Sequence, residues 1–276
     1  MIDLHCHILH KLDDGPQAFT ESLQMARAYA ANGYRIVAAT PHMIPGTAWT
    51  PSVDRIKKKL TVLNRTNEQE GLKIKIVSGM EVAMDPQITD LLDEGRLLCL
   101  GESSCLLVET PFQRLPRGWE QVIFSVMSKG YSILLAHPER CEQLSDRLQL
   151  VEQLIESGVH LQVNLGSFLC QYGRTVARTV RFMAEKGWIH CLATDSHGTR
   201  GLDPTEMTVA KDRLSNLIGP DNLQLIAREN PMKVLCGKSP RAIKKTDFIS
   251  RERKARRWQF WKSNYKRHEL SNSYEQ

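Results

Sequence analysis

Residues 1–15 read MIDLHCHILHKLDDG, and the His-Cys-His motif at residues 5–7 decides how the rest of the chain is interpreted. An extended strand alternates its faces, so His5 and His7 point to one side while Cys6 points to the other. Two imidazoles on one face can supply the first two ligands of a metal site, and a pair of hydrogen-bonded histidines is an equal alternative at this point. The segment therefore predicts a first strand that carries ionisable side chains.

Seven short runs of β-forming residues alternate with longer amphipathic segments along the chain. This alternation predicts parallel strands with right-handed crossovers, and seven near-continuous apolar strands favour a distorted seven-stranded TIM-like α/β barrel. The expected strands are Met1–His7, Tyr34–His42, Ile74–Val82, Cys105–Pro111, Tyr131–Glu139, Val159–Ser167 and Ile189–His197. The expected helices are Thr20–Ala31, Val53–Glu70, Asp85–Glu94, Trp119–Lys129, Arg147–Ser157 and Thr175–Lys186.

Six of the seven expected strands deliver a histidine or a carboxylate at their carboxyl ends, and strand six offers only Asn164 and Ser167. In parallel barrels these ends lie at one rim, which is where the active site is found. Each residue alone has an ordinary structural explanation, but so many ionisable groups without counter-charge would suffer desolvation and like-charge repulsion. Divalent cations remove this cost, so the sequence predicts a metal site. The candidate ligands are His5, His7, Asp14, His42, Glu81, Glu109, His137, Asp195 and His197.

This set of ligands is too large for one ion and suits two or three. Mixed nitrogen and oxygen donors favour Mn²⁺, Zn²⁺ or Fe, and ions about 3.5–4 Å apart can hold both reacting oxygens of a phosphoryl transfer. Arg140 and Arg200 follow candidate ligands closely and are expected to bind phosphate oxygens, with surface ion pairs as the alternative. Asp14 or His197 is expected to act as general acid, unless both are fully engaged as ligands.

The composition is that of an ordinary globular protein of 276 residues, with 41% hydrophobic and 25% charged residues. The first residues lack the basic and then apolar pattern of a secretory signal, and no apolar run approaches the roughly 20 residues of a membrane span. Seven scattered cysteines without a CxxC pair favour a reducing compartment. These observations predict a cytoplasmic protein.

The positive charge of the chain is concentrated in its last segment. Residues 238–276 contain 12 Lys and Arg against 4 Asp and Glu, whereas the whole chain has a net charge of +6. Aromatic residues lie between these charges, a spacing compatible with a surface helix on anionic lipid. We expect a catalytic unit over residues 1–237 and a tail over residues 238–276, whose residues 251–268 contact the membrane. An acidic partner, nonspecific nucleic acid or a solvated terminus are alternatives, and no specific nucleic-acid site is predicted.

Together these motifs resemble the PHP superfamily, named for polymerase and histidinol phosphatase. The shared features are HxH near the amino terminus, the isolated His42, the strand ends at Glu81 and Glu109, AHPER and DxH. Within the superfamily, the stretches MIDLHCHILHKLDDGP, VAATPHMIPG, GMEV, ATDSH and ENPMKVL look most like the bacterial metal-dependent protein-tyrosine phosphatases. The likeness covers roughly residues 1–236.

The resemblance implies a barrel with a trinuclear metal site at the nine candidate ligands. It implies two or three divalent ions, with Mn²⁺ as the first expectation and Fe, Zn²⁺, Co²⁺ or Mg²⁺ as alternatives. The implied reaction is attack of a metal-bound hydroxide on phosphotyrosine. The implied substrate is a phosphotyrosine protein, an autophosphorylated, membrane-associated tyrosine kinase that controls capsule and exopolysaccharide synthesis. Such a substrate is reached from the cytoplasm or from the inner membrane face.

Four other functions fit parts of the sequence. A small-molecule phosphatase of the histidinol-phosphatase type uses similar ligands. An amidohydrolase also begins with HxH, but it uses eight strands and a modified lysine where this chain has Glu109. Cys141 and Arg147 have the Cys-x₅-Arg spacing of cysteine phosphatases, but acidic residues between them oppose phosphate binding and a thiolate. A barrel that keeps metals only for stability has no need of an arginine suited to phosphate.

Overall fold

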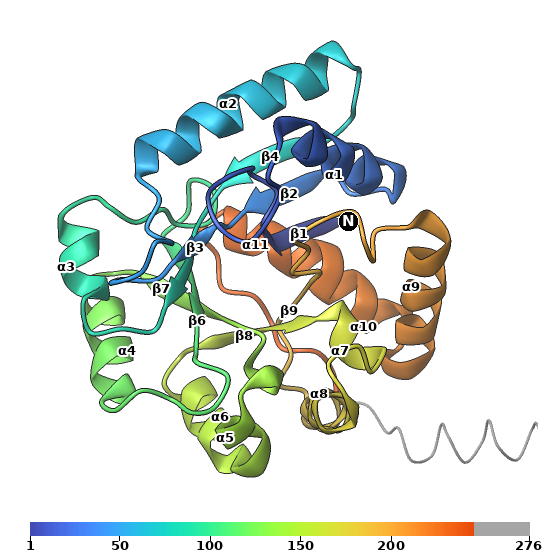
Figure 1. Cartoon of the computed structure of the whole chain (residues 1–276). Coiled ribbons are helices and arrows are strands. Elements are labelled where there is room, and N and C mark those ends of the chain that lie inside the picture. Colours follow the sequence, from blue (N-terminus) through green and yellow to red (C-terminus); the bar gives the residue numbers. More distant parts are fainter. Residues whose placement is uncertain (246–276) are drawn as a thin grey trace, which may run out of the picture.

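The structure, a computed structural model, describes residues 1–245, and the segment 251–268 expected at the membrane lies outside the described residues. Within residues 1–245, parallel β-strands form the centre and helices pack around them (Figure 1). The strands are β1 (Ile2–Cys6), β2 (Ile36–Ala39), β3 (His42–Met43), β4 (Lys75–Ser78), β5 (Glu81–Ala83), β6 (Cys105–Glu109), β7 (Ser132–Ala136), β8 (His160–Asn164) and β9 (Cys191–Ala193).

The strands form two parallel sheets, of order β1-β2-β4 and β3-β5-β6-β7-β8-β9. The chain passes from the first sheet to the second between β2 and β3 and again between β4 and β5. The outer strands β1 and β9 meet through two backbone hydrogen bonds of 3.0 Å, from His7 N to Ser196 O and from Asp195 N to His5 O. The predicted α/β class with parallel strands is therefore confirmed. The strand pairing gives two sheets and does not by itself establish a closed seven-stranded barrel.

All seven expected strands are present, but the second and the third are each interrupted. The second breaks at Thr40 and Pro41, where proline has no N–H to donate to a neighbouring strand. The third breaks at Gly79 and Met80. A Cβ at Gly79 would lie 3.0 Å from the Thr40 side chain and 3.1 Å from that of Leu100, so a larger residue there would have to push these side chains aside.

The expected strand ends at Glu139, Ser167 and His197 are wrong, because the backbone turns away earlier. His137 and Asp195 have φ angles of 33° and 56°, which is uncommon for residues with a side chain. Such strain is concentrated at functional sites, and both residues are candidate ligands. The sixth expected strand is β8, which ends at Asn164, and the short helix α7 begins at the next residue.

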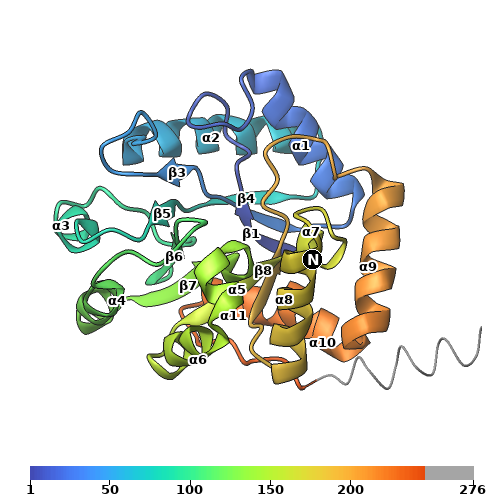
Figure 2. The same ribbon diagram turned by 60° about the horizontal axis from the view of Figure 1, so that its bottom comes forward.

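The helices surround the strands, and Figure 2 shows this arrangement from a second direction. Those expected from the sequence are confirmed within a few residues, and the region after residue 203 adds helices that were not expected. No helix in the described part of the chain combines the length and apolar character that a membrane span requires. The helices are α1 (Phe19–Ala31), α2 (Val53–Gln69), α3 (Ile88–Asp93), α4 (Trp119–Ser128), α5 (Glu142–Asp146), α6 (Leu148–Glu156), α7 (Leu165–Phe168), α8 (Arg174–Lys186), α9 (Pro204–Ile218), α10 (Pro220–Gln224) and α11 (Asn230–Leu235), with a 3₁₀-helix over Pro138–Arg140 and a π-helix over Leu225–Glu229.

A second, smaller apolar cluster is formed mainly by strand residues. Its members are Ile2, Leu4, Ala38, Leu100, Cys105, Leu107, Leu134, Ala136, Cys191 and Val234. Cys105 and Leu107 of β6 face this cluster, whereas Leu106 and Val108 pack into the larger core beneath the helices. Glu109 continues the alternation of Cys105 and Leu107. The same period that builds the core therefore turns a carboxylate toward the rim.

His190, just before β9, is a buried histidine of structural rather than catalytic kind. Its Nδ1 accepts a hydrogen bond from the backbone N–H of Leu161 at 3.1 Å, and its carbonyl oxygen accepts one from Asn230 Nδ2 at 2.7 Å. Burial, assisted by the neighbouring His160, lowers the pKa of His190 to about 4. The neutral ring therefore ties this residue to β8, and its backbone carbonyl ties it to α11.

We expect His190 to make the fold acid-sensitive. Because its folded pKa is below the value near 6.5 of the unfolded chain, its contribution is complete above pH 6.5 and is lost as the pH falls toward 4. Between pH 7 and pH 5 the wild type should lose about 2 kcal/mol more unfolding free energy than His190→Asn, whose amide oxygen preserves the acceptor. Urea denaturation at both pH values measures the difference, and parallel losses would contradict it.

Candidate metal centre

The candidate centre begins at the end of β1, where His5 and His7 are buried side by side. Their Nε2 atoms lie 3.2 Å apart. Two nitrogen ligands bound to one ion at about 2.1 Å are separated from each other by about 3 Å, so this spacing fits a shared cation. Cys6, between them in sequence, packs into the hydrophobic core, as the alternation of the strand predicts.

Glu81, the first residue of β5, lies in the middle of the cluster and is fully buried. Its Oε2 is 2.9 Å from His42 Nδ1 and 3.2 Å from His5 Nε2. The same oxygen is 3.3 Å from His7 Nε2, and Oε1 is 2.9 Å from His137 Nε2. Because Glu81 faces four imidazoles through both oxygens, it could offer an oxygen to each of two cations bound among them.

All nine residues that the sequence nominates as ligands lie in this cluster. Within the described residues, two buried atoms at its centre, His42 Nδ1 and Glu81 Oε2, have close neighbours but no hydrogen bond, as expected for atoms that a cation would engage. The donors therefore fit two or three divalent ions, while the role of each residue as a ligand stays a prediction. Donor atoms within 4.8 Å of one another form four groups: His7, Asp14, His42 and His197; His5, His7 and Glu81; His5, His137 and Asp195; His42, Glu81 and Glu109.

Opposite charges compensate one another within the centre. Burial alone would raise the pKa of Glu81, but the charge of His5 and the hydrogen bonds of the neighbouring histidines together outweigh it and hold this pKa well below its usual range. Burial alone would lower the pKa of His42, but the carboxylates of Glu109 and Glu81 raise it to about 10. Protons on the imidazoles thus neutralise the carboxylates, and binding of cations has to displace them.

Asp14 and His197 form the open side of the centre. His197 Nε2 lies 3.2 Å from Asp14 Oδ1, and this hydrogen bond lowers the pKa of Asp14. The side chain of Asp14 is 46% exposed and that of His197 is 33% exposed. Of the nine residues in the cluster, these two are therefore the most accessible to a substrate or to water.

Two side chains that the sequence analysis did not single out orient the first histidines. Asp13 Oδ2 accepts hydrogen bonds from His7 Nδ1 at 2.7 Å and from the backbone N–H of His42 at 3.1 Å. Gln162 Oε1 is 2.9 Å from His5 Nδ1. Each contact turns the Nε2 of its histidine toward the cluster, as outer partners of metal-binding histidines do.

We expect Asp13→Asn to weaken the binding of Mn²⁺ by about ten- to hundredfold, because loss of the charge and of one acceptor frees the His7 ring. Titration calorimetry on chelated full-length protein measures this affinity. Asp90→Asn is the matched control, because Asp90 is exposed on α3. Equal affinities of the two variants would contradict the orienting role.

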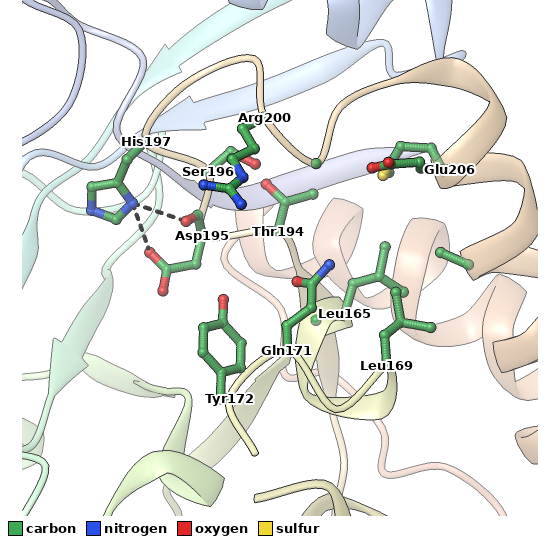
Figure 3. A pocket seen from close by; sticks show the side chains of 14 residues that line it. Leu165, Leu169, Gln171, Tyr172, Thr194, Asp195, Ser196, His197, Arg200 and Glu206 are labelled. Carbon is green, nitrogen blue, oxygen red and sulfur yellow. Dashed lines mark hydrogen bonds and ion pairs between the residues drawn. The ribbon is translucent and has the colours of Figure 1, made fainter. Parts of the chain in front are cut away.

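Arg140 reaches the centre from the 3₁₀-helix after β7. Its Nη1 donates to Asp195 Oδ2 at 2.7 Å. The guanidinium carbon lies 4.5 Å from the ring centroid of Phe112 and 4.3 Å from that of Tyr172. Because contacts with two aromatic rings restrict a planar cation, Arg140 is held at the edge of the cluster. Arg200 is exposed in the loop after β9 and lines a pocket beside Asp195 (Figure 3).

β8 and the short helix α7 that follows it supply hydrogen bonds in and around the centre. Asn164 Nδ2 donates to Asp195 Oδ2 at 2.9 Å, and Ser167 Oγ donates to the buried Glu139 at 2.7 Å. Trp49 stacks on the ring of His42 at a centroid distance of 5.0 Å. Of these partners only Asn164 and Ser167 could be placed at the rim from the sequence, because Trp49 lies in a loop without regular period.

Cys141 does not form a thiol-dependent phosphatase site. It is 1% exposed and belongs to the hydrophobic core. A nucleophilic thiolate needs an accessible and electropositive environment. The Cys-x₅-Arg spacing is therefore a chance match.

The whole region that carries these features matches one family model. The model is described as capsular polysaccharide synthesis, CpsB/CapC, and it covers residues 1–236. This chain belongs to the CpsB/CapC family. Membership in the CpsB/CapC family confirms the resemblance that the sequence motifs indicate.

Individual proteins resemble this CpsB/CapC chain over most of its length. The tyrosine-protein phosphatase YwqE of Bacillus subtilis (strain 168) is 31% identical over 200 residues, which are 72% of this chain and 78% of YwqE. The tyrosine-protein phosphatase CpsB of Streptococcus agalactiae serotype III (strain NEM316) is 25% identical over 240 residues, which are 85% of this chain and 98% of that CpsB.

A solved structure is similar to this CpsB/CapC chain in fold as well. It comes from work on YwqE of Bacillus subtilis and CpsB of Streptococcus pneumoniae, described there as metal-dependent tyrosine phosphatases. The two chains superpose with a TM-score of 0.80 at 28% identity, and the match covers 88% of this chain and 100% of that one. The arrangement of strands and helices is therefore that of the family.

Proposed function

We propose that this chain is a metal-dependent phosphomonoester hydrolase that acts as a protein-tyrosine phosphatase. The observation that carries the proposal is the position of Glu81 among four imidazoles, because a bridge between two cations suits phosphoryl transfer. The named relatives are tyrosine-protein phosphatases, and the family model is described by capsular polysaccharide synthesis. The proposed substrate is accordingly a phosphotyrosine protein of such a system, a membrane-associated tyrosine kinase.

The nine candidate ligands would hold two or three divalent cations, with Mn²⁺ as our first choice. When bound, the cations would supply hydroxide at neutral pH and offset the charge of the phosphate. Arg140 would bind phosphate oxygens, since its planar guanidinium is already held by contacts with the rings of Phe112 and Tyr172. Arg200 would add a second positive charge from the loop after β9.

Asp14 or His197 is the proposed proton donor to the leaving oxygen, and full engagement of both residues as ligands is the alternative. Both are partly exposed at the open side, and they are 3.2 Å apart, so a proton on one can be passed to the other. A tyrosine leaving group has a pKa near 10 and needs less assistance than an alkoxide. Because Asp14 and His197 are partly exposed to water, aryl phosphates, which need less help from a proton donor, suit this centre better than alkyl phosphates.

The proposal includes a finer view of the chain. Closure between β1 and β9 would complete the distorted seven-stranded barrel, with the two hydrogen bonds of the His5–Ser196 region as its seam. Residues 1–237 would form the catalytic unit, and residues 238–276 a basic tail that brings it to the inner face of the membrane.

The test is hydrolysis of three substrates by protein reloaded with Mn²⁺: a phosphotyrosine peptide, histidinol phosphate and a phosphodiester. The proposal expects the phosphotyrosine peptide to have the highest kcat/KM, because its phenolate leaves more easily than the alkoxide of histidinol phosphate. The phosphodiester should be inert, because the proposed reaction is that of a monoester with a single ester bond. His42→Ala should abolish turnover. A preference for histidinol phosphate would instead support the small-molecule phosphatase.

A further inference from the structure

Three positively charged side chains meet where α2 packs on the loop after β1. They are Lys11 in the loop and Arg55 and Lys59 on α2, and we name these three residues the basic patch. Arg55 Nη2 donates to the backbone carbonyl oxygen of Lys11 at 2.6 Å. Lys59 Nζ lies 2.9 Å from Nε2 of His10, the residue before Lys11. Two contacts therefore join α2 to the loop and hold the three cations together.

The charge of the basic patch is not compensated within the described residues. None of its three side chains forms an ion pair there, and neither does Asp54, the acidic residue in the first turn of α2. Arg55 and Lys59 are four residues apart, so they share one side of the helix and repel each other. Arg55 also lies in the first turn, where the helix dipole disfavours a cation. A bound anion would relieve both costs.

The pKa of Lys59 agrees with this arrangement. Partial burial lowers it first, and the positive charges of Arg55 and Lys11 lower it further. The same three cations, together with burial, lower the pKa of His10. The cations are therefore close enough to one another to act on a single ligand.

The basic patch lies beside the open side of the metal centre. Lys11 precedes the partly exposed Asp14 by three residues, and three residues of chain span at most about 11 Å. Lys11 has a φ angle of 53°, which is uncommon for a residue with a side chain, and the hydrogen bond from Arg55 to its carbonyl oxygen holds this turn. An extended peptide would cover the distance from the centre to the basic patch with about three or four residues.

We propose that the basic patch binds acidic side chains of the protein substrate, located two to four residues from the phosphotyrosine. The inference rests on the proposed function, because a phosphate held at the centre places the flanking residues of its peptide over the adjacent surface. Carboxylates supply the counter-charge that the basic patch lacks. Complementary charge of this kind speeds the encounter and favours one direction of the peptide across the site.

The experiment compares phosphotyrosine peptides that carry either glutamate or glutamine at the second to fourth positions from the phosphotyrosine. One pair of peptides has these residues on the N-terminal side, and a second pair has them on the C-terminal side. With full-length protein reloaded with Mn²⁺ at low salt, the glutamate peptide of one pair should have a kcat/KM about fivefold above that of its glutamine counterpart. This ratio should approach one in about 0.5 M salt, because dissolved ions screen exposed charges.

A triple variant, Lys11→Gln with Arg55→Gln and Lys59→Gln, should reduce the glutamate-to-glutamine ratio to about one. Lys11→Gln alone should reduce it about twofold, and this variant tests the same point if the triple variant does not fold. Lys57→Gln is the matched control, because Lys57 is exposed on the same helix but is two residues from both Arg55 and Lys59 and therefore points to the other side. It should keep the full ratio.

Equal kcat/KM for glutamate and glutamine in both pairs, or a ratio that the triple variant leaves unchanged, would overturn the inference while leaving the proposed function intact. A triple variant that loses the same factor on both peptides and keeps their ratio would assign the basic patch to the phosphate itself, and would overturn the inference as well. Hydrolysis of p-nitrophenyl phosphate but of no phosphotyrosine peptide would contradict the proposed function and the inference with it.

Discussion

Glu81→Gln should reduce kcat/KM for p-nitrophenyl phosphate by about a thousandfold or more in protein reloaded with Mn²⁺. The glutamine amide has the shape of the carboxylate but no charge, and its NH₂ group donates hydrogen bonds where a carboxylate oxygen would accept them. In the native chain both oxygens of Glu81 face nitrogen atoms, Oε2 at 2.9 Å from His42 Nδ1 and Oε1 at 2.9 Å from His137 Nε2. The substitution therefore removes the negative charge that adjacent cations would share, and steady-state kinetics with a phosphate-release assay measure the loss.

The control for this variant makes the same chemical change where no cation is expected. Glu94, at the end of α3, is 55% exposed and pairs only with Arg96 at 2.9 Å among the residues the structure describes. Glu94→Gln should keep kcat/KM within twofold of the wild type, since exposed ion pairs contribute little. If folded Glu81→Gln retained more than a tenth of the native rate at saturating Mn²⁺, Glu81 would not be the bridge that the proposed function requires.

The candidate site was more predictable from the sequence than the strand boundaries were. Strand and helix alternation forces the carboxyl ends of parallel strands to one edge, so ionisable residues at those ends were expected to meet, and the described residues bring all nine together. The local backbone was not predictable in this way. The positive φ angles of His137 and Asp195 could not be assigned from residue type, because Asp and His adopt that region more often than most other side chains but still only at a small minority of positions.

The neighbouring Asp13 and Asp14 show where sequence reasoning reaches its limit. Both aspartates follow the first strand, and the sequence pattern nominates Asp14 as a ligand but assigns no role to Asp13. Their roles are separated by the path of the loop, which folds back so closely at Gly15 that a Cβ there would collide with the carbonyl oxygen of His7. This close approach places Asp13 on His7 Nδ1 and leaves Asp14 facing His197. The glycine was visible in the sequence, but the contact it permits depends on the tertiary fold.

Removal of divalent metal should lower the thermal stability of this protein by roughly 10 °C. Ions that bind only the folded chain stabilise it by about 4 kcal/mol when present at a thousand times their dissociation constant, and each kcal/mol shifts Tm by about 2–4 °C in a chain of this size. In the absence of ions, buried groups such as Glu81, His5 and His42 neutralise one another through protons on the histidines. Bound ions would replace these protons. Scanning calorimetry of chelated protein, before and after addition of Mn²⁺, measures the shift.

The Tm shift tests the centre without reference to turnover, so it separates a metal site from a catalytic one. Glu81→Gln should lose most of the shift, because its amide cannot share charge between ions, whereas Glu94→Gln should show the native response. Addition of Mg²⁺ should restore less stability than Mn²⁺, since imidazole nitrogen is a poor ligand for Mg²⁺ and five of the nine candidate donors are histidines. A chelated protein whose Tm equals that of the Mn²⁺-loaded form within one degree would show that the cluster holds no structural cation, and the bridge at Glu81 would lose its physical basis.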